Sequence, residues 1–261
     1  MLDILKPALL LLGLAIVFAA ILAYFAKKLS VEEDPRIQAV KELLSGANCG
    51  ACGEGGCDSF AKSLVEGKAE ISQCNPTSKR NKEEICKILG VSGVGEETLV
   101  KVFCSGGNAC KDKYDYQGYG DCRSMELLAS GRKACNVGCM GMGSCVDACV
   151  YHAVEVNADG YAETDKDKCT TCGACIKACP KGLIRRIPKS AKIMVACSNH
   201  DKGRDVREVC KAGCIACGLC VKTCKYGAIT LHDNLAVVDY DKCTGCLECV
   251  GKCPTKVIKV L

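Results

Sequence analysis

The hydrophobic pattern divides the chain into an apolar N-terminus and a long, mostly polar remainder. Residues Ala8–Ala26 carry no charge, and Lys27 and Lys28 follow directly. A helix of this length, at about 1.5 Å per residue, nearly matches a bilayer hydrocarbon core of about 30 Å. We therefore expect a transmembrane anchor over residues 1–28, and the two lysines favour a cytoplasmic location for the rest of the chain. A cleaved signal peptide is the alternative, but its apolar region would be shorter.

Beyond this segment, helical periodicity is confined to the region before residue 90. Apolar residues recur at helical spacing over Pro35–Leu44, Asp58–Glu66 and Lys82–Leu89. Further on, short β-prone segments alternate with tight, glycine-rich loops. The pattern predicts an α+β, multidomain protein in which a small, mostly helical domain over residues 29–90 precedes units of another kind.

Composition changes this picture, because 26 of the 261 residues are cysteine. The chain has no Trp, four Phe and eight Tyr, so too few large side chains remain for a conventional core of this size. Cysteine at this density indicates disulfides or metal. The net charge of +5 is small, and we expect no nucleic-acid partner.

The cysteine spacing favours iron–sulfur clusters over disulfides and zinc. The pattern C-x2-C-x2-C-x3-C begins at Cys169, at Cys214 and at Cys243. Three thiolates on such a loop converge on one site, and the fourth ligates the neighbouring cluster. Structural zinc is usually held instead by two C-x2-C hairpins around a tetrahedral ion.

The second half of the chain contains two copies of one module. Two stretches align without gaps: 133–156 on 208–231, and 167–180 on 241–254. Each copy predicts a bacterial-type two-cluster ferredoxin module, the first over 91–190 and the second over 191–261. The first copy carries an additional stretch near residues 107–124.

The ferredoxin ligand pattern assigns most of these cysteines to clusters. In the second module, the two sets are Cys214, Cys217, Cys220 and Cys253, and Cys224, Cys243, Cys246 and Cys249. In the first module, one set is Cys149, Cys169, Cys172 and Cys175. The remaining set has only Cys139, Cys145 and Cys179, because Met142 stands where the other copy has Cys217.

The Met142 site therefore lacks one thiolate. A thioether is a poor substitute on iron, so we expect a three-iron cluster or a four-iron cluster with a borrowed ligand. The available cysteines are Cys104, Cys110, Cys122 and Cys135. Cys135 is the first choice, because it lies closest to Cys139 in the sequence. These four cysteines would alternatively hold a further cluster, which gives five to six [4Fe-4S] clusters in total, whereas Cys197 and Cys210 are too few to bind one alone.

A different cysteine pattern lies in the predicted helical domain. Cys49, Cys52, Cys57 and Cys74 form C-x2-C-x4-C-x16-C, and a glycine-rich loop surrounds the first three. Four thiolates within so short a segment predict another cluster. Cys86, inside a helical stretch, is expected to be a buried thiol.

This arrangement resembles the iron–sulfur B subunits of the Rnf complexes, which are membrane ferredoxin–NAD oxidoreductases that pump Na⁺ or H⁺. The resemblance covers the whole chain, and its specific part is the C-x2-C-x4-C-x16-C domain directly behind a single apolar segment. It implies a single-pass subunit of the cytoplasmic membrane and of a translocase. Electrons would enter from reduced ferredoxin and leave to other membrane and flavin-bearing subunits. The sequence contains no nucleotide loop or catalytic dyad, so we expect no independent substrate chemistry in this chain.

Two other functions fit parts of the sequence. A polyferredoxin subunit of a hydrogenase or formate dehydrogenase would contain the ferredoxin modules, but would give no reason for the C-x2-C-x4-C-x16-C domain beside an anchor. A non-catalytic redox sensor would need an output module, and the sequence shows none.

Overall fold

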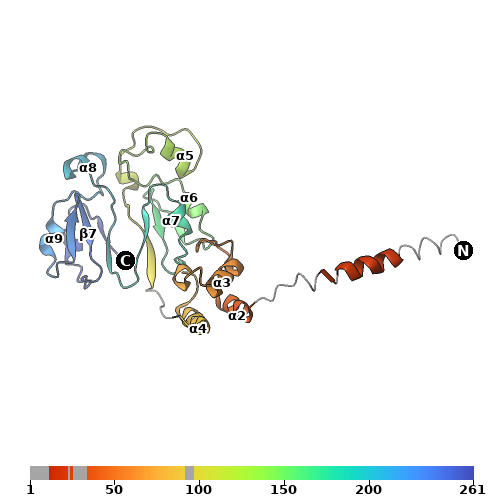
Figure 1. Ribbon diagram of the computed structural model, residues 1–261. Coiled ribbons are helices and arrows are strands. Elements are labelled where there is room, and N and C mark those ends of the chain that lie inside the picture. Colours follow the sequence, from red (N-terminus) through yellow and green to blue (C-terminus); the bar gives the residue numbers. More distant parts are fainter. Residues whose placement is uncertain (1–11, 23, 26–33, 92–96) are drawn as a thin grey trace.

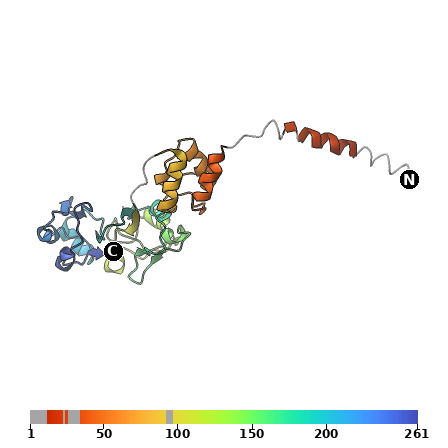
Figure 2. The ribbon, with the colours of Figure 1, turned by 90° about the horizontal axis from the view of Figure 1, so that it is seen from below.

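The computed structural model describes residues 12–22, 24–25, 34–91 and 97–261. Residues 12–22 and 24–25 are helical, and the remainder of the predicted anchor lies outside the described residues. Within the described ranges, no helix combines the length and the apolar character needed to cross a bilayer. The rest of the chain forms a helical unit, coloured orange, and two α+β units. In both views the first α+β unit lies between the helical unit and the second α+β unit (Figures 1 and 2).

The helical unit consists of three α-helices with well-defined ends. They are α2 (Pro35–Leu43), α3 (Cys57–Val65) and α4 (Lys79–Leu89). Helix α4 begins three residues earlier than its apolar pattern predicts, because the Ser78 side chain accepts a hydrogen bond from Asn81 N at 3.3 Å and caps the first turn. Gly90 ends this helix in a left-handed conformation with φ 68°.

Each α+β unit contains two antiparallel strand pairs, one a hairpin and one that joins its two ends. In the first unit, β1 (Thr98–Val102) pairs with β4 (Ile184–Pro188), and β2 (Val154–Val156) with β3 (Ala162–Thr164). In the second unit, β5 (Ile193–Val195) pairs with β8 (Ile258–Val260), and β6 (Ile229–His232) with β7 (Leu235–Val238). The repeat in the sequence is therefore also a repeat in the strand topology.

Short helices follow the cysteine loops of both α+β units. They are α6 (Ser144–Asp147), α7 (Ala174–Ala178), α9 (Leu219–Thr223) and α10 (Glu248–Lys252). The residue before each of these helices adopts a left-handed backbone conformation. In three cases it is a glycine, and in the fourth it is Leu247, with φ 64°; the glycines are Gly143, Gly173 and Gly218. Two further helices, α5 (Cys122–Leu127) and α8 (Gly203–Val209), lie outside this pattern.

Four hydrophobic clusters stabilise the described parts of the chain: a core in each unit, and a small cluster of Cys110, Cys135 and Cys210. Phe60 and Ile85 are buried in the helical unit, Val154 and Ile184 in the first α+β unit, and Ile229 with its neighbours in the second. Buried cysteines contribute to every core. The cores are small because the strands and helices are short, and the cysteines therefore occupy the positions that large side chains fill in other proteins.

Candidate iron–sulfur centres

The first group of thiols lies in the helical unit. Cys74 and Cys52 are neighbours, and burial raises the pKa of the Cys74 thiol, with the Cys52 thiol adding to the rise. Cys57 is the first residue of α3, and its N–H donates to Asn48 Oδ1 at 2.9 Å. Cys52 and Cys57 both pack against the core that contains Cys74. Cys86 is buried in the same core, on α4.

The second group lies in the first α+β unit, which is the first ferredoxin module. Burial raises the pKa of the Cys175 thiol to about 11, and the thiols of Cys169, Cys172 and Cys149 add to this rise. The structure thus brings together the four cysteines that the ferredoxin pattern assigns to one cluster. Ala153 N–H donates to Cys149 Sγ at 3.3 Å, and in the second module Ala228 N–H donates to Cys224 Sγ at the same distance.

The Met142 site is a small pocket in the same module. Its lining includes Cys139, Cys145 and Cys179, together with Met142 and Cys122. Burial raises the pKa of the Cys145 thiol to about 12, and the thiols of Cys139, Cys122 and Cys179 contribute. Of the four cysteines that the sequence offered as the missing ligand, Cys122 is the one that lines this site.

Hydrogen bonds from the insertion hold Cys122 in place. Cys122 N–H donates to Ser144 Oγ at 2.8 Å, at the start of α6. The Asp121 side chain accepts hydrogen bonds from the first turn of α5 and fixes where the helix begins. Lys181 is buried and anchors the other end, through an ion pair with Glu126 at 2.5 Å. Sequence proximity favoured Cys135, but these contacts fold the longer loop back over the site.

The second module contains two further groups of thiols. The first lines one small pocket and consists of Cys214, Cys217, Cys220 and Cys253. The other lines a second small pocket and consists of Cys224, Cys243, Cys246 and Cys249. Both groups are those that the ferredoxin pattern predicts. In each module, one short helix connects the two sites. Helix α6 contains Cys145 of one site and precedes Cys149 of the other, and α9 contains Cys220 of one site and ends at Cys224 of the other.

The remaining cysteines gather at a place that the sequence did not predict. Cys104, Cys110 and Cys135 line a cavity together with Cys197 and Cys210. The duplication contained a signal for this, because Cys104 aligns with Cys197 and Cys135 with Cys210. All four of these cysteines lie outside the ferredoxin motifs. Each cysteine of the first copy nevertheless has an equivalent in the second.

The number and type of donors in these groups suit four-iron clusters. A four-iron cluster takes one thiolate on each iron. Four cysteines line the Met142 site and each of the two sites of the second module. Among the residues that the structure describes, no three Cys, His, Asp or Glu side chains are arranged to hold a single metal ion.

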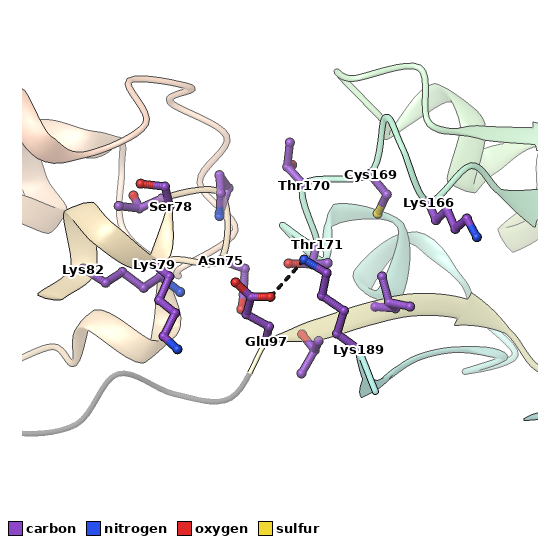
Figure 3. Close-up of a pocket in the computed structure, with 14 residues that line it drawn as sticks. Asn75, Ser78, Lys79, Lys82, Glu97, Lys166, Cys169, Thr170, Thr171 and Lys189 are labelled. Atoms are coloured by element: carbon purple, nitrogen blue, oxygen red, sulfur yellow. Dashed lines mark hydrogen bonds and ion pairs between the residues drawn. The ribbon is translucent and has the colours of Figure 1, made fainter. Parts of the chain in front are cut away.

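A polar groove lies between the helical unit and the first module (Figure 3). Four lysines line it, namely Lys79, Lys82, Lys166 and Lys189. Glu97 forms an ion pair with Lys189 at 2.9 Å, and Cys169 is the one thiol in the lining. With one thiol among charged side chains, this groove lacks the donor set of a cluster site.

Tyr151 links the thiols of the helical unit to those of the first module. Burial raises the pKa of its hydroxyl, and the Cys49 and Cys172 thiols add to the rise. Lys177 Nζ donates to Ala51 O at 2.9 Å and joins the same two loops. The group in the helical unit and the Cys169 group are therefore neighbours across this contact.

Comparison with known proteins agrees with the geometry. Three family models match: "Putative Fe-S cluster" over residues 44–76, "4Fe-4S binding domain" over 162–185 and "4Fe-4S dicluster domain" over 213–257. The part of the first module that contains Met142 is matched by none of these three.

Full-length relatives extend the comparison beyond these segments. The B subunit of the Na(+)-translocating ferredoxin:NAD(+) oxidoreductase complex of Acetobacterium woodii is 40% identical over 98% of this chain and 77% of its own. The B subunit of the ion-translocating oxidoreductase complex of Methanosarcina acetivorans is 39% identical over 96% of both chains. The corresponding protein of the proton-translocating complex of Clostridium ljungdahlii is 37% identical over 95% of this chain and 89% of its own. The chain therefore belongs to the B-subunit family of the Rnf-type ion-translocating oxidoreductases.

Proposed function

We propose that this chain carries electrons from reduced ferredoxin into an Rnf-type ion-translocating ferredoxin–NAD⁺ oxidoreductase. The observation that carries the proposal is the recurrence of four-cysteine sets in three consecutive units, with their thiols close together in the two ferredoxin modules. Iron–sulfur clusters supply one-electron transfer over a wide range of potentials. The chain contributes an electron path rather than a substrate pocket, and it functions as one subunit of an oxidoreductase.

Four of the five ligand sets follow the sequence motifs, and each is proposed to hold a [4Fe-4S] cluster. They are Cys49, Cys52, Cys57 and Cys74; Cys149, Cys169, Cys172 and Cys175; Cys214, Cys217, Cys220 and Cys253; and Cys224, Cys243, Cys246 and Cys249. The fifth is Cys122, Cys139, Cys145 and Cys179, in which Cys122 replaces the thiolate lost at Met142. This assignment gives a four-iron rather than a three-iron cluster in the first module.

The protein controls these sites by burial and by hydrogen bonds to sulfur. The Ala153 and Ala228 N–H groups each donate to the thiol of a preceding cysteine, Cys149 or Cys224. Such donors stabilise negative charge on sulfur and raise the reduction potential of a site. Tyr151 lies near thiols of both the helical unit and the first module, which places its ring beside the path between their sites.

The position of the chain in a membrane complex is also part of this proposal. Residues 1–28 would anchor it by a single pass, with the iron–sulfur units in the cytoplasm and with membrane and flavin-bearing subunits as neighbours. The support is the uncharged segment followed by two lysines. One relative is named for Na⁺ and another for protons, so the family resemblance fits either ion.

Reduction of the anaerobically prepared full chain by reduced ferredoxin tests the proposed electron entry. Rapid mixing should bleach the visible iron–sulfur absorbance of the chain, and the extent should correspond to several clusters. A Cys52→Ala variant reports whether the helical unit lies on the path, with Cys86→Ala as the control. A chain that accepts electrons from hydrogenase or formate dehydrogenase, but not from ferredoxin, would instead support the alternative polyferredoxin function.

A further inference from the structure

The two ferredoxin modules enclose a group of five thiols at their interface. Cys104, Cys110 and Cys135 come from the first module, and Cys197 and Cys210 from the second. They line one pocket at the interface, just as the thiols of the Met142 site and of the two sites of the second module line theirs. Cys110, Cys135 and Cys210 are 5%, 8% and 7% exposed and pack against one another. None of the five belongs to the ligand sets proposed above.

The surroundings of this cavity obey the internal repeat. Ser105 Oγ of the first module donates to Ala196 O of the second at 3.3 Å. In return, Ser198 Oγ donates to Phe103 O at 3.0 Å. Ser105 and Ser198 are equivalent residues, and each follows one of the cavity cysteines. The interface is therefore approximately two-fold symmetric, with Cys104 and Cys197 on opposite sides of the axis.

A second pair of reciprocal hydrogen bonds joins the insertion of the first module to the second module beside this cavity. Lys111 N–H donates to Val209 O at 2.9 Å, and Lys211 N–H donates to Ala109 O at 3.0 Å. These two hydrogen bonds form an antiparallel bridge between Cys110 and Cys210. The insertion thus supplies a thiol as well as the backbone that joins the modules.

Polar donors point at the sulfurs of this group. The Asn199 side chain is 3% exposed, and its Nδ2 donates to Cys135 Sγ at 3.3 Å. Its backbone N–H donates to Cys197 Sγ at 3.5 Å. Cys104 Sγ accepts from Cys139 N at 3.3 Å and from Gly106 N at 3.5 Å. A buried amide group that donates hydrogen bonds to cysteine sulfurs is expected where those sulfurs carry negative charge, as they do when they bind iron.

We propose that this cavity holds a sixth [4Fe-4S] cluster, shared between the two modules. Cys104, Cys135 and Cys197 are ligands, and the fourth is Cys110 or Cys210, which lie against each other on the bridge. Whichever of the two is not a ligand is a hydrogen-bond donor to the other. All the donors are sulfur, which is the ligand type of iron–sulfur clusters.

The location gives this cluster a role in the electron path. Cys104 accepts a hydrogen bond from the N–H of Cys139, a proposed ligand of the Met142 site. On the other side, Cys197 packs in the same hydrophobic core as Cys214. Cys214 is a proposed ligand in the second module. The sixth cluster therefore lies between the facing sites of the two modules and would connect them.

Metal content of the full chain tests this inference. The wild-type protein, reconstituted anaerobically with ⁵⁷Fe and sulfide, should bind about twenty-four irons, four in each of six clusters. The Cys104→Ala/Cys197→Ala variant should lose about four of them, and Cys86→Ala should lose none. The single variants Cys110→Ala and Cys210→Ala identify the fourth ligand: the variant that loses the cluster lacks that ligand. Full iron in the double variant, zinc in place of iron, or a Cys110–Cys210 disulfide would overturn the proposal.

A second variant distinguishes loss of the cluster from disruption of the interface by the cysteine replacements. A Cβ at Gly106 would lie 3.4 Å from Cys210 Sγ and 3.6 Å from Cys104 Sγ, so the larger side chain of Gly106→Val should occupy cluster space while every thiol remains. It should lose the same irons, with the other Mössbauer components unchanged. Retention of all the iron in Gly106→Val would contradict a cluster here. About twenty irons in the wild type, with normal reduction by ferredoxin, would remove this inference and leave the proposed function intact.

Discussion

At the scale of single residues, Cys122 distinguishes the first ferredoxin module from the second. Met142 occupies the position of the ligand Cys217, and Cys122 enters the same cavity from the insertion. Its N–H is held by Ser144 Oγ at 2.8 Å, so the thiol is positioned before any metal arrives. The insertion thus supplies a thiol at the site where Met142 has replaced a cysteine.

Replacement of Cys122 should convert the Met142 site to a three-iron cluster. In Cys122→Ser, the anaerobic, oxidised protein should show the EPR signal of a three-iron cluster, because three strong thiolates remain. Adding Met142→Cys to that variant should restore the four-iron cluster, because the second module uses a cysteine at this position.

Met142→Leu alone serves as the control and should leave the spectra unchanged. A three-iron signal in Met142→Leu, or none in Cys122→Ser, would show that the thioether and not Cys122 completes the site.

At the scale of elements, Lys181 fastens the insertion to the module. Its side chain is 6% exposed and pairs with Glu126 at 2.5 Å, and it also donates to Ser130 O at 2.8 Å. The Glu126 side chain is 30% exposed, so the pair lies between the buried and the surface case, and removing Lys181 should cost more than the about 0–1 kcal/mol of an exposed pair.

Lys181→Met should therefore loosen α5 and make the Met142 site lose iron to a chelator faster than the other sites. The control is Lys189→Met, which removes the Glu97 pair at 2.9 Å between side chains that are 51% and 62% exposed. Such exposed pairs contribute about 0–1 kcal/mol. Equal rates of iron loss in the two variants would contradict a fastening role for Lys181.

Two glycines in short helices should respond oppositely to alanine. Gly251 lies within α10 with nothing within 4 Å of an added Cβ, so Gly251→Ala should stabilise the second module by about 0.5–1 kcal/mol. A Cβ at Gly203 would lie 2.0 Å from Ile215 O, so Gly203→Ala should destabilise it by about 1–3 kcal/mol. Anaerobic thermal unfolding of the cluster-loaded chain measures both. A shift of the same sign in both variants would contradict this description of α8 and α10.

Hairpins and helices were largely predictable from the sequence, whereas the pairing of distant strands was not. Local signals suffice for α4, whose cap and left-handed Gly90 lie at its ends. In contrast, β1 pairs with β4 across most of the first module. No local pattern specifies that register, because it depends on how the intervening loops fold.

The same limit applied to the cysteines. Motif spacing predicts the thiol groups whose members lie on one loop, together with the crossed fourth member, Cys253 for example. It left Cys122 as one of four candidates for the Met142 site, because the contacts that fold the insertion back involve Ser144 and Lys181 in distant segments. It also missed the gathering of Cys135 with Cys197, since the contact between the modules is not encoded in either one alone.

At the scale of the whole molecule, the cluster units and the predicted anchor are separable parts of the chain. Every cysteine lies at or after Cys49, and within the part of the chain that the structure describes, each hydrophobic core is formed from residues after residue 33. A chain that lacks residues 1–28 should therefore bind as much iron per molecule as the full chain. It should also remain in the supernatant when membranes are sedimented, whereas the full chain should sediment with them. A proportional loss of iron in the truncated chain would contradict the separation.

The three units form a row, and this arrangement suits a path that electrons follow in one direction. The first ferredoxin module lies between the other two units in both views (Figures 1 and 2). Tyr151 lies between the helical unit and this module, and the Ser105 and Ser198 contacts join the two modules. Breaking the path at one end should then stop transfer through the entire subunit.

Ferredoxin-dependent NAD⁺ reduction by membranes that contain the assembled complex tests the central claim most directly. Cys52→Ala removes a proposed ligand in the helical unit, and Cys86→Ala removes a buried cysteine of the same core. With equal amounts of assembled complex, the first variant should reduce NAD⁺ only at the background rate, and the second at the wild-type rate. Full activity in Cys52→Ala would contradict the account, because electrons would then reach NAD⁺ without using the path through this chain.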